Sequence, residues 1–535
     1  MKNHNSQFLK QATILASAGL IARLLGFLYR IPMQNILGDD GTGVYGASYN
    51  LYMFFFVLSS AGIPAAIAKM VSTRMALKQY ENALKVFKVS LVISGFLGFV
   101  FMLIMFFFAP QLSSFFSSYH VVYSLRTLAP TVFIVSIMSV YRGYFQGLGN
   151  SMPTAISQII EQLLNAIFSV ILIYILIDEG IGIAAAGGTA ASGIGAFFGL
   201  IFILFVYTIS KRRHVLRITK SRKNYKQESS KKLGLELILT AIPIIAGTAI
   251  FTITNIIDTR MVVDILQDTG FTYSEAWMLY GQLNGKYVVI TTLPVAVAAA
   301  IATALIPSIS RSVTLKEIKS TRHKINMALR TAMLICIPAA MGIGVMANQI
   351  LLFLFPNNPD GGILLQVGAL SVLFLALSQV ATGILHGLHI LKVPILAALI
   401  GATIKIFLNI WLIAIPSINI IGAVISTTVC YIIASTINLT KVYKATNSKM
   451  DVSNIFIKPI FASVVMGLVC FVVYHSFFLL FPSNTISLIL AIFISIITYF
   501  SIMICIGGIT KTELHYLPLG NKIFAILQKL GIIVK

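Results

Sequence analysis

Two arginines, Arg23 and Arg30, lie within the first long apolar stretch of the chain. A charge at membrane depth is costly unless it faces a water-filled cavity or a partner. On one helix these residues would be about two turns apart, so they would share a face and lie about 10 Å apart along the axis. Guanidinium groups bind phosphate oxygens in a bidentate manner, so the spacing predicts a site for an extended, phosphate-bearing anion. The alternative for Arg30 is that its side chain extends to the membrane interface near Pro32.

Five further polar residues inside apolar segments are candidates for the same task or a related one. Lys286 would add a point charge to the predicted anion site. Glu161 and Lys405 carry opposite charges at equivalent places of an internal repeat, so they either form an ion pair between two lobes or are hydrated separately. Asp258 is a candidate for holding a coupling cation, with a plain interface role as the alternative. Asn409, one helical turn after Lys405, is expected to share this interlobe or coupling role.

The composition indicates an all-α integral membrane protein. Hydrophobic residues make up 58% of the 535 residues and charged residues only 10%, and the mean hydropathy is +0.92. Apolar runs of about 20 residues or more predict about fourteen spanning helices. These are expected near 12–37, 46–72, 86–109, 121–145, 154–177, 181–209, 235–266, 277–307, 325–355, 362–388, 394–415, 419–443, 455–481 and 485–509.

The loops between these segments alternate in charge. Lys and Arg collect in the cytoplasmic loops of membrane proteins. By this rule the basic loops after segments 2, 6, 8, 12 and 14 are cytoplasmic, and the acidic loops after segments 1, 5, 7 and 9 face outward. The first acidic loop is predicted to carry Asp39 and Asp40. The pattern predicts a multi-pass protein of the cell membrane with both termini in the cytoplasm.

One long basic segment, 211–234, separates six predicted helices from the rest. We predict an N-terminal lobe at 1–210, a C-terminal lobe at 235–445, and two further helices with a cytoplasmic tail at 446–535. The basic segment is interpreted as a hinge between the lobes. A solvated linker without a role of its own is the alternative.

A weak internal repeat supports two lobes. The sequence FQGLGNSMP (145–153) resembles LHGLHILKVP (385–394), and both are predicted turns between helices. A charged residue and an asparagine follow each turn at the same spacing: Glu161 with Asn165, and Lys405 with Asn409. Two parallel six-helix repeats with binding at their interface are a known transporter plan.

Several functional classes are disfavoured by the sequence. The net charge of +23 is spread over loops rather than gathered on a soluble domain, so no nucleic-acid partner is expected. No paired-carboxylate, HExxH or phosphate-loop motif is present, so the chain is not expected to be an enzyme. The four cysteines lack metal-ligand spacing, and neither a metal nor a cofactor is expected. A coupling ion or the membrane potential would supply the driving force.

Three runs of sequence carry a resemblance to a known family. They are RLLGFLYRIPMQNILGDDGTGVYGASYNLY (23–52), SSAGIPAAIAKMVS (59–72) and YGQLNGKYVVITTLPVAVAAAIATALIPSISR (280–311). Together with the GLGNSMP turn, they resemble the polysaccharide-transporter branch of the MOP superfamily. Within that branch the chain is most similar to the MurJ-like YtgP/SpoVB proteins of Gram-positive bacteria. The resemblance covers essentially the whole chain.

This resemblance implies a V-shaped fold of two six-helix lobes around a cationic cavity, with helices 13 and 14 forming a groove for a lipid tail. It implies transport of lipid II, the undecaprenyl-diphosphate-linked peptidoglycan precursor, from the inner to the outer leaflet. Membrane lipids and cell-wall synthesis enzymes are the further partners it suggests. It places Arg23 and Lys286 on the family's substrate-binding cations, whereas the family's second arginine would fall at Tyr29 rather than Arg30.

Three other functions stay open. A flippase for another polyprenyl-linked glycan, such as a capsule, teichoic-acid or sporulation-related unit, would use the same physical principles. A drug/cation antiporter of the same superfamily would be expected to carry a cavity carboxylate and about twelve spans. A membrane scaffold for wall-synthesis or sporulation enzymes would tolerate loss of the cavity charges.

Overall fold

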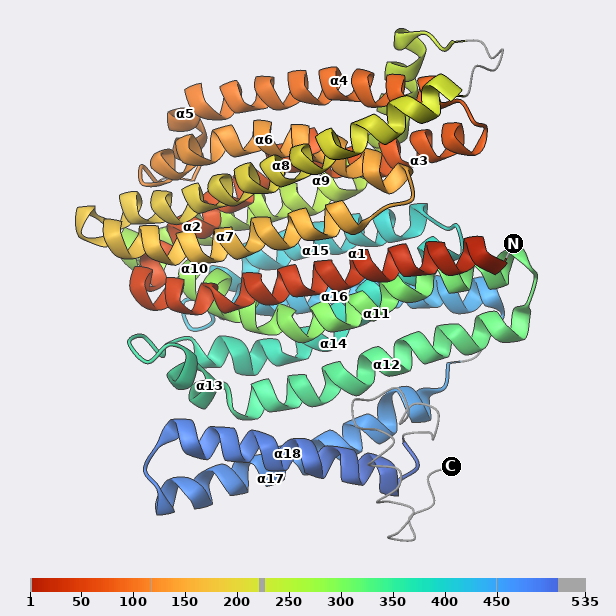
Figure 1. The fold of residues 1–535 in the computed structure, drawn as a ribbon. Coiled ribbons are helices and arrows are strands. Elements are labelled where there is room, and N and C mark those ends of the chain that lie inside the picture. Colours follow the sequence, from red (N-terminus) through yellow and green to blue (C-terminus); the bar gives the residue numbers. More distant parts are fainter. Residues whose placement is uncertain (1, 117, 221–226, 449, 509–535) are drawn as a thin grey trace. The chain divides into compact units, whose positions relative to one another are not determined.

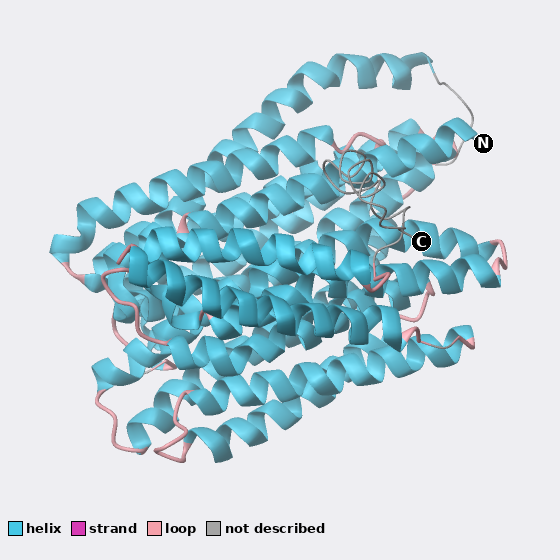
Figure 2. Cartoon of the chain, turned by 90° about the horizontal axis from the view of Figure 1, so that it is seen from below, coloured by secondary structure: helices cyan, strands magenta, loops and turns pink. Residues whose placement is uncertain are grey.

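The computed structural model describes residues 2–116, 118–220, 227–448 and 450–508. Within this described part every regular element is helical, and none is a strand (Figures 1 and 2). The predicted all-α class is therefore confirmed. Residues 221–226 of the predicted hinge and 509–535 of the predicted cytoplasmic tail lie outside the described residues.

The helices follow one another along the chain with short connections. The α-helices are α1 (Lys2–Leu28), α2 (Arg30–Phe56), α3 (Ile63–Ala76), α4 (Tyr80–Phe107), α5 (Ala109–Ser114), α6 (Val121–Gly147), α7 (Met152–Leu176), α8 (Ile181–Lys220), α9 (Ser230–Asp268), α10 (Tyr273–Gly281), α11 (Val288–Thr314), α12 (Ile318–Val345), α13 (Ala347–Leu354), α14 (Gly362–Gly387), α15 (Lys392–Ile413), α16 (Ile421–Thr446), α17 (Lys458–Leu480) and α18 (Asn484–Cys505). Three π-helical segments, η1 (Val57–Ala61), η3 (Gln282–Tyr287) and η4 (Ser453–Ile457), and one 3₁₀ segment, η2 (Ile177–Glu179), join some of them.

Thirteen helices of the described part are long and apolar enough to cross a membrane. The residues 30–76 form a single span in this count, and the apolar part of α1 is a shorter helix, Ser17–Leu28. The predicted multi-spanning architecture is confirmed, and the predicted number of fourteen is approximate. The difference lies at the start of the chain, where the predicted first span is divided between α1 and α2.

The prediction of a loop after the first span is wrong. The chain stays helical through Asp39 and Asp40, which belong to α2. A kink in α2 at Gly38, where φ is 71° and ψ is −179°, changes the direction of the chain without a loop. Glycine adopts this backbone conformation without the steric penalty that other residues meet. Asp39 is only 2% exposed as a result of its place in the helix.

The chain divides into two units, of which the first comprises residues 1–289 and 402–423. In this unit α6 packs against α3, α4 and α8 (Figure 1). The ring of Phe87 on α4 lies among aromatic rings of α6 and α8, with centroid distances of 5.1 Å to Tyr141, 4.7 Å to Tyr144 and 5.2 Å to Tyr207. Burial of large aromatic side chains at such distances stabilises the packing of these three helices.

The second unit comprises residues 290–401 and 424–535. In its described part α12 packs against α14 and α17, and α17 packs against α18. Tyr499 of α18 is buried and donates a hydrogen bond to the carbonyl oxygen of Leu334 on α12, at 3.1 Å. The last two helices therefore pack on α12. The lobe boundaries expected from the sequence stay a prediction.

The turns that carry the predicted repeat have the same backbone geometry. After α6, the amide nitrogens of residues 148, 149 and 150 donate to the carbonyl oxygens of residues 144, 146 and 145. After α14, those of residues 388, 389 and 390 donate to the oxygens of residues 384, 386 and 385. The central residue has a positive φ in both turns, 77° at Gly149 and 61° at His389. The two turns thus share one hydrogen-bond pattern, but the same pattern also follows α3, α9 and α18, so the repeat stays a prediction.

Candidate functional site

The two arginines of the first apolar stretch lie on one helical path. Although α1 and α2 are separate elements, the amide of Tyr29 donates to the oxygen of Leu25, at 3.2 Å, and Met33 donates to Tyr29, at 3.1 Å. The side chain of Arg23 is exposed, and the structure gives it no ion pair or hydrogen bond among the described residues. An exposed arginine within an apolar helix is a candidate contact for an anion at membrane depth.

Arg30 lies in a more enclosed place, beside the phenol groups of Tyr29 and Tyr45. The two hydroxyl oxygens are 3.1 Å apart and hydrogen-bonded. Tyr45 and Tyr49 stack one turn apart on α2, with ring centroids at 5.9 Å. Arg30 therefore lies near several phenol hydroxyl groups, which can accept hydrogen bonds from a guanidinium that also binds an anion.

Lys286, the third predicted anion ligand, is buried and paired. Its Nζ lies 2.8 Å from Oδ1 and 2.9 Å from Oδ2 of Asp39. The side chains are 1% and 0% exposed. Gln34 donates a further hydrogen bond from Nε2 to Oδ1 of Asp39. In this structure the ammonium thus has a carboxylate of the chain itself as its anion.

Glu161 and Lys405 do not pair with each other, contrary to one of the predicted alternatives. Glu161 of α7 accepts from Nη2 of Arg142 on α6, at 2.7 Å, and Arg142 also donates from Nε to the hydroxyl of Ser157, at 2.8 Å. Lys405 of α15 pairs with Asp258 of α9. The two residues thus have separate partners, that of Glu161 on the preceding helix α6 and that of Lys405 on α9.

Asp258 is held by two residues of α15. Its Oδ2 pairs with Nζ of Lys405, and its Oδ1 accepts from Nδ2 of Asn409, at 2.9 Å. The neighbouring Thr259 shares a hydrogen bond with the hydroxyl of Tyr280, at 2.8 Å. The structure thus brings together Asp258, Lys405 and Asn409, which were predicted individually. In this arrangement the cation beside Asp258 is the ammonium of Lys405.

A family model described as polysaccharide biosynthesis protein matches residues 8–313, which is more than half of the chain. The chain belongs to this family. A second model, MatE, matches residues 288–411. Both matches agree with the MOP superfamily, and the chain is a member of its MurJ-like polysaccharide-transporter branch.

Relatives from Bacillus subtilis (strain 168) resemble the chain over most of its length. Stage V sporulation protein B is 28% identical over 468 residues, which cover 86% of this chain and 88% of that protein. Lipid II flippase MurJ is 30% identical over 446 residues, covering 80% and 81%. By its name the second relative is a flippase, and the branch to which the chain belongs is one of transporters rather than enzymes.

Solved structures share the fold of this family member. The structure titled "Lipid II flippase MurJ, inward closed conformation" matches with a TM-score of 0.67 and 16% identity, covering 91% of this chain and 97% of that one. An inward-facing multidrug resistance MATE family transporter of the MOP superfamily matches with a TM-score of 0.66 and 15% identity, covering 82% and 98%. At these identities the likeness concerns the fold.

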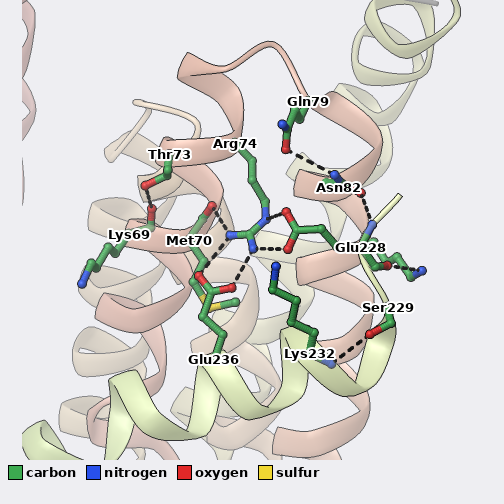
Figure 3. A network of polar contacts seen from close by, with 11 residues as sticks. Lys69, Met70, Thr73, Arg74, Gln79, Asn82, Glu228, Ser229, Lys232 and Glu236 are labelled. Carbon is green, nitrogen blue, oxygen red and sulfur yellow. Dashed lines mark hydrogen bonds and ion pairs between the residues drawn. The ribbon is translucent and has the colours of Figure 1, made fainter. Parts of the chain in front are cut away.

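The structure also contains a charge cluster around Arg74 that the sequence did not lead us to expect (Figure 3). Arg74, in the last turn of α3, is 5% exposed. It donates from Nε and Nη2 to the two carboxylate oxygens of Glu228, at 3.2 and 2.6 Å, and from Nη2 to Glu236, at 2.7 Å. The backbone of Glu228 is held as well, because its amide donates to Asn82 and its oxygen accepts from Lys85 on α4. The start of α9 is thereby fixed to α3 and α4.

Sequence reasoning thus missed three partners: Asp39, Arg142 and Arg74. Asp39 was assigned to the first acidic loop, and Arg74 lies just beyond the predicted span 46–72, in the basic loop that follows it. Arg142 lies close to the predicted turn at 145–153, where a basic residue is ordinary. The available signal was Gly38 before Asp39, since a glycine can kink a helix and leave the next residue inside it.

Proposed function

We propose that this protein is a lipid II flippase. In this proposal it moves the undecaprenyl-diphosphate-linked peptidoglycan precursor from the inner to the outer leaflet, by alternating access of lobes at 1–210 and 235–445 with 211–234 as the hinge. The relatives and the fold support a flippase for a lipid-linked glycan. The identification of lipid II as the specific cargo is our proposal.

The main observation in support of this proposal is the exposed side chain of Arg23. It lies in an apolar helix and on the same helical path as Arg30. A diphosphate offers several oxygens to guanidinium groups, and such charge-assisted hydrogen bonds are strong away from bulk water. We assign the diphosphate to Arg23 and Arg30 first, and to Lys286 in a conformation that frees its ammonium.

The test measures lipid II on the outer leaflet of cells depleted of their own lipid II flippases. The wild-type protein should restore exposure of lipid II, and Arg23→Ala should not, at equal amounts in the membrane. Arg23→Lys should restore it in part, because a point charge replaces the bidentate group. Loss of one charge-assisted contact is worth about tenfold to hundredfold in affinity.

Arg126→Ala is the matched control. Arg126 is also an exposed arginine of a membrane helix, and its Cζ lies 6.0 Å from the ring centroid of Phe106. This variant should behave as the wild type. If Arg23→Ala restored exposure of lipid II, Arg23 would not be part of the binding site. Failure of the wild type itself would favour another polyprenyl-linked glycan, an alternative supported by the similarity to Stage V sporulation protein B.

A further inference from the structure

The pair of Lys286 and Asp39 closes a tightly packed seam between α2 and the segment α10–η3. Asp39 follows the kink at Gly38, and Lys286 lies in the π-helical turn η3. Interruptions of regular helix such as π-helical turns occur often at functional sites. The two charged groups are thus presented by irregular backbone on both sides of the seam.

Glycines allow this seam to close. A Cβ atom at Gly281 would lie 1.8 Å from the carbonyl oxygen of Asp39, and one at Gly285 would lie 2.2 Å from Oε1 of Gln34. On the α2 side, a Cβ atom at Gly43 would lie 2.7 Å from the oxygen of Trp277. The backbones approach so closely that side chains larger than hydrogen do not fit. A phosphate group has no room beside Lys286 while the seam is closed.

One polar atom in the seam is poorly satisfied. Oε1 of Gln34 is buried and lacks a hydrogen-bond partner among the described residues. A buried acceptor without a partner costs free energy, which opposes the closed state. The same glutamine donates from Nε2 to Asp39. The residue that holds the carboxylate in place therefore also favours opening.

We propose that Asp39 is the internal counter-anion of Lys286, and that it and the diphosphate of the substrate bind this ammonium in alternation. The inference rests on the proposed function. An unpaired ammonium inside the membrane is costly, so the empty transporter needs an anion at this position. Asp39 supplies that anion while the seam is closed. The diphosphate replaces it when α2 and η3 separate, so binding of the substrate and opening of the seam are coupled.

Binding of farnesyl diphosphate to the purified protein in detergent micelles tests this exchange. Asp39→Asn keeps the size of the side chain and removes the competing charge. We expect it to bind the probe about tenfold more tightly than the wild type, in line with the coupling of close charge pairs. Lys286→Gln should weaken binding. The double variant should show no gain over Lys286→Gln, because Asp39 acts through the ammonium.

Labelling of Lys286 with an amine-reactive reagent, read by mass spectrometry, gives a second measurement. The residue should be protected in the wild type, label readily in Asp39→Asn, and become protected again by the probe. If Asp39→Asn does not fold, Gln34→Leu keeps every charge and removes the hydrogen bond that holds the carboxylate. It should also bind the probe more tightly, by a smaller factor, because losing the hydrogen bond to the charged carboxylate favours opening more than removing the unpaired Oε1 favours closure.

The outcomes separate the two proposals. If Arg23→Ala weakens binding while Asp39→Asn, or Gln34→Leu in its place, binds no better than the wild type, the counter-anion inference is overturned and the diphosphate site stands. If the wild type does not bind the probe and the Arg23 variant is indistinguishable from it, the proposed function itself fails. A gain in Asp39→Asn that persists without Lys286 would also overturn the inference, since the effect would not pass through the ammonium.

Discussion

Replacing Arg74 with methionine should destabilise the protein more than removing either of the carboxylates it binds. Methionine keeps much of the apolar stem and removes the guanidinium, so the change isolates the charge. Glu228 and Glu236 would then lose the guanidinium that binds both of them. The side chains of Arg74 and Glu228 are only 6% and 19% exposed, whereas that of Glu236 is 39% exposed.

The exposed fractions of these side chains determine how much each substitution should lower the free energy of unfolding. Breaking a buried ion pair by removing one partner costs about 3–5 kcal/mol, and an exposed pair contributes about 0–1 kcal/mol. We therefore expect Arg74→Met to lower the free energy of unfolding by about 3 kcal/mol. Glu236→Gln should lower it by less than about 1 kcal/mol. Glu228→Gln should fall between them, since hydrogen bonds to a charged group contribute about 1.5–3 kcal/mol.

The triple variant Arg74→Met, Glu228→Gln, Glu236→Gln is the decisive comparison. It removes the unpaired charges that the single change leaves behind, so it should recover much of the lost stability. Unfolding in mixed micelles of mild detergent and sodium dodecyl sulfate would measure the free energies. A loss below about 0.5 kcal/mol for Arg74→Met would refute the reasoning. A triple variant as unstable as the single one would show that packing, and not charge, holds the start of α9.

Two further predictions follow from the other ion pairs of the first unit, measured by the same unfolding experiment. Lys405→Met should destabilise the protein by about 2–3 kcal/mol, and adding Asp258→Asn should restore most of that loss; equal instability of the double variant would contradict a charge-pair role. Arg142→Met should cost more than Glu161→Gln, because it also removes the hydrogen bond to Ser157. The reverse order would indicate that Glu161 has a partner other than Arg142.

The sequence allowed prediction of the helices because their main determinant is local. A run of about 20 apolar residues has few alternatives in a bilayer, where each backbone polar group needs an internal partner. The turns at 145–153 and 385–394 were predictable for the same reason, since glycine and proline act within a few residues. The error at Asp39 shows the limit of that approach. A polar, glycine-containing stretch is typical of a loop, yet here the helix continues through it with a kink at Gly38.

The partners of the charged residues were not predictable in this way. Periodicity tells which face of a helix a residue occupies, but it does not tell which helix lies opposite. Lys286 and Asp39 are 247 positions apart, and Lys405 and Asp258 are 147 apart. Lys405 and Glu161 were considered together because they are equivalent in the repeat. Two residues at equivalent positions of a repeat have similar sequence surroundings, but that similarity does not imply that the two residues contact each other.

The chemistry of each cation indicates which pairs are permanent and which can exchange. Arg74 uses a planar fork to bind two carboxylates, and both come from the segment that begins α9. Separation of such a pair loses several directed hydrogen bonds at once, which suits a fixed anchor. Lys286 presents an ammonium to the carboxylate of Asp39, and an anion bound by an ammonium can be replaced without a matching planar geometry. A transporter needs both kinds of contact, because its helices must stay anchored while its binding site changes partners. The presence of arginine at 74 and lysine at 286 agrees with that division, in which the proposed counter-anion is Asp39 and the proposed anchors are Glu228 and Glu236.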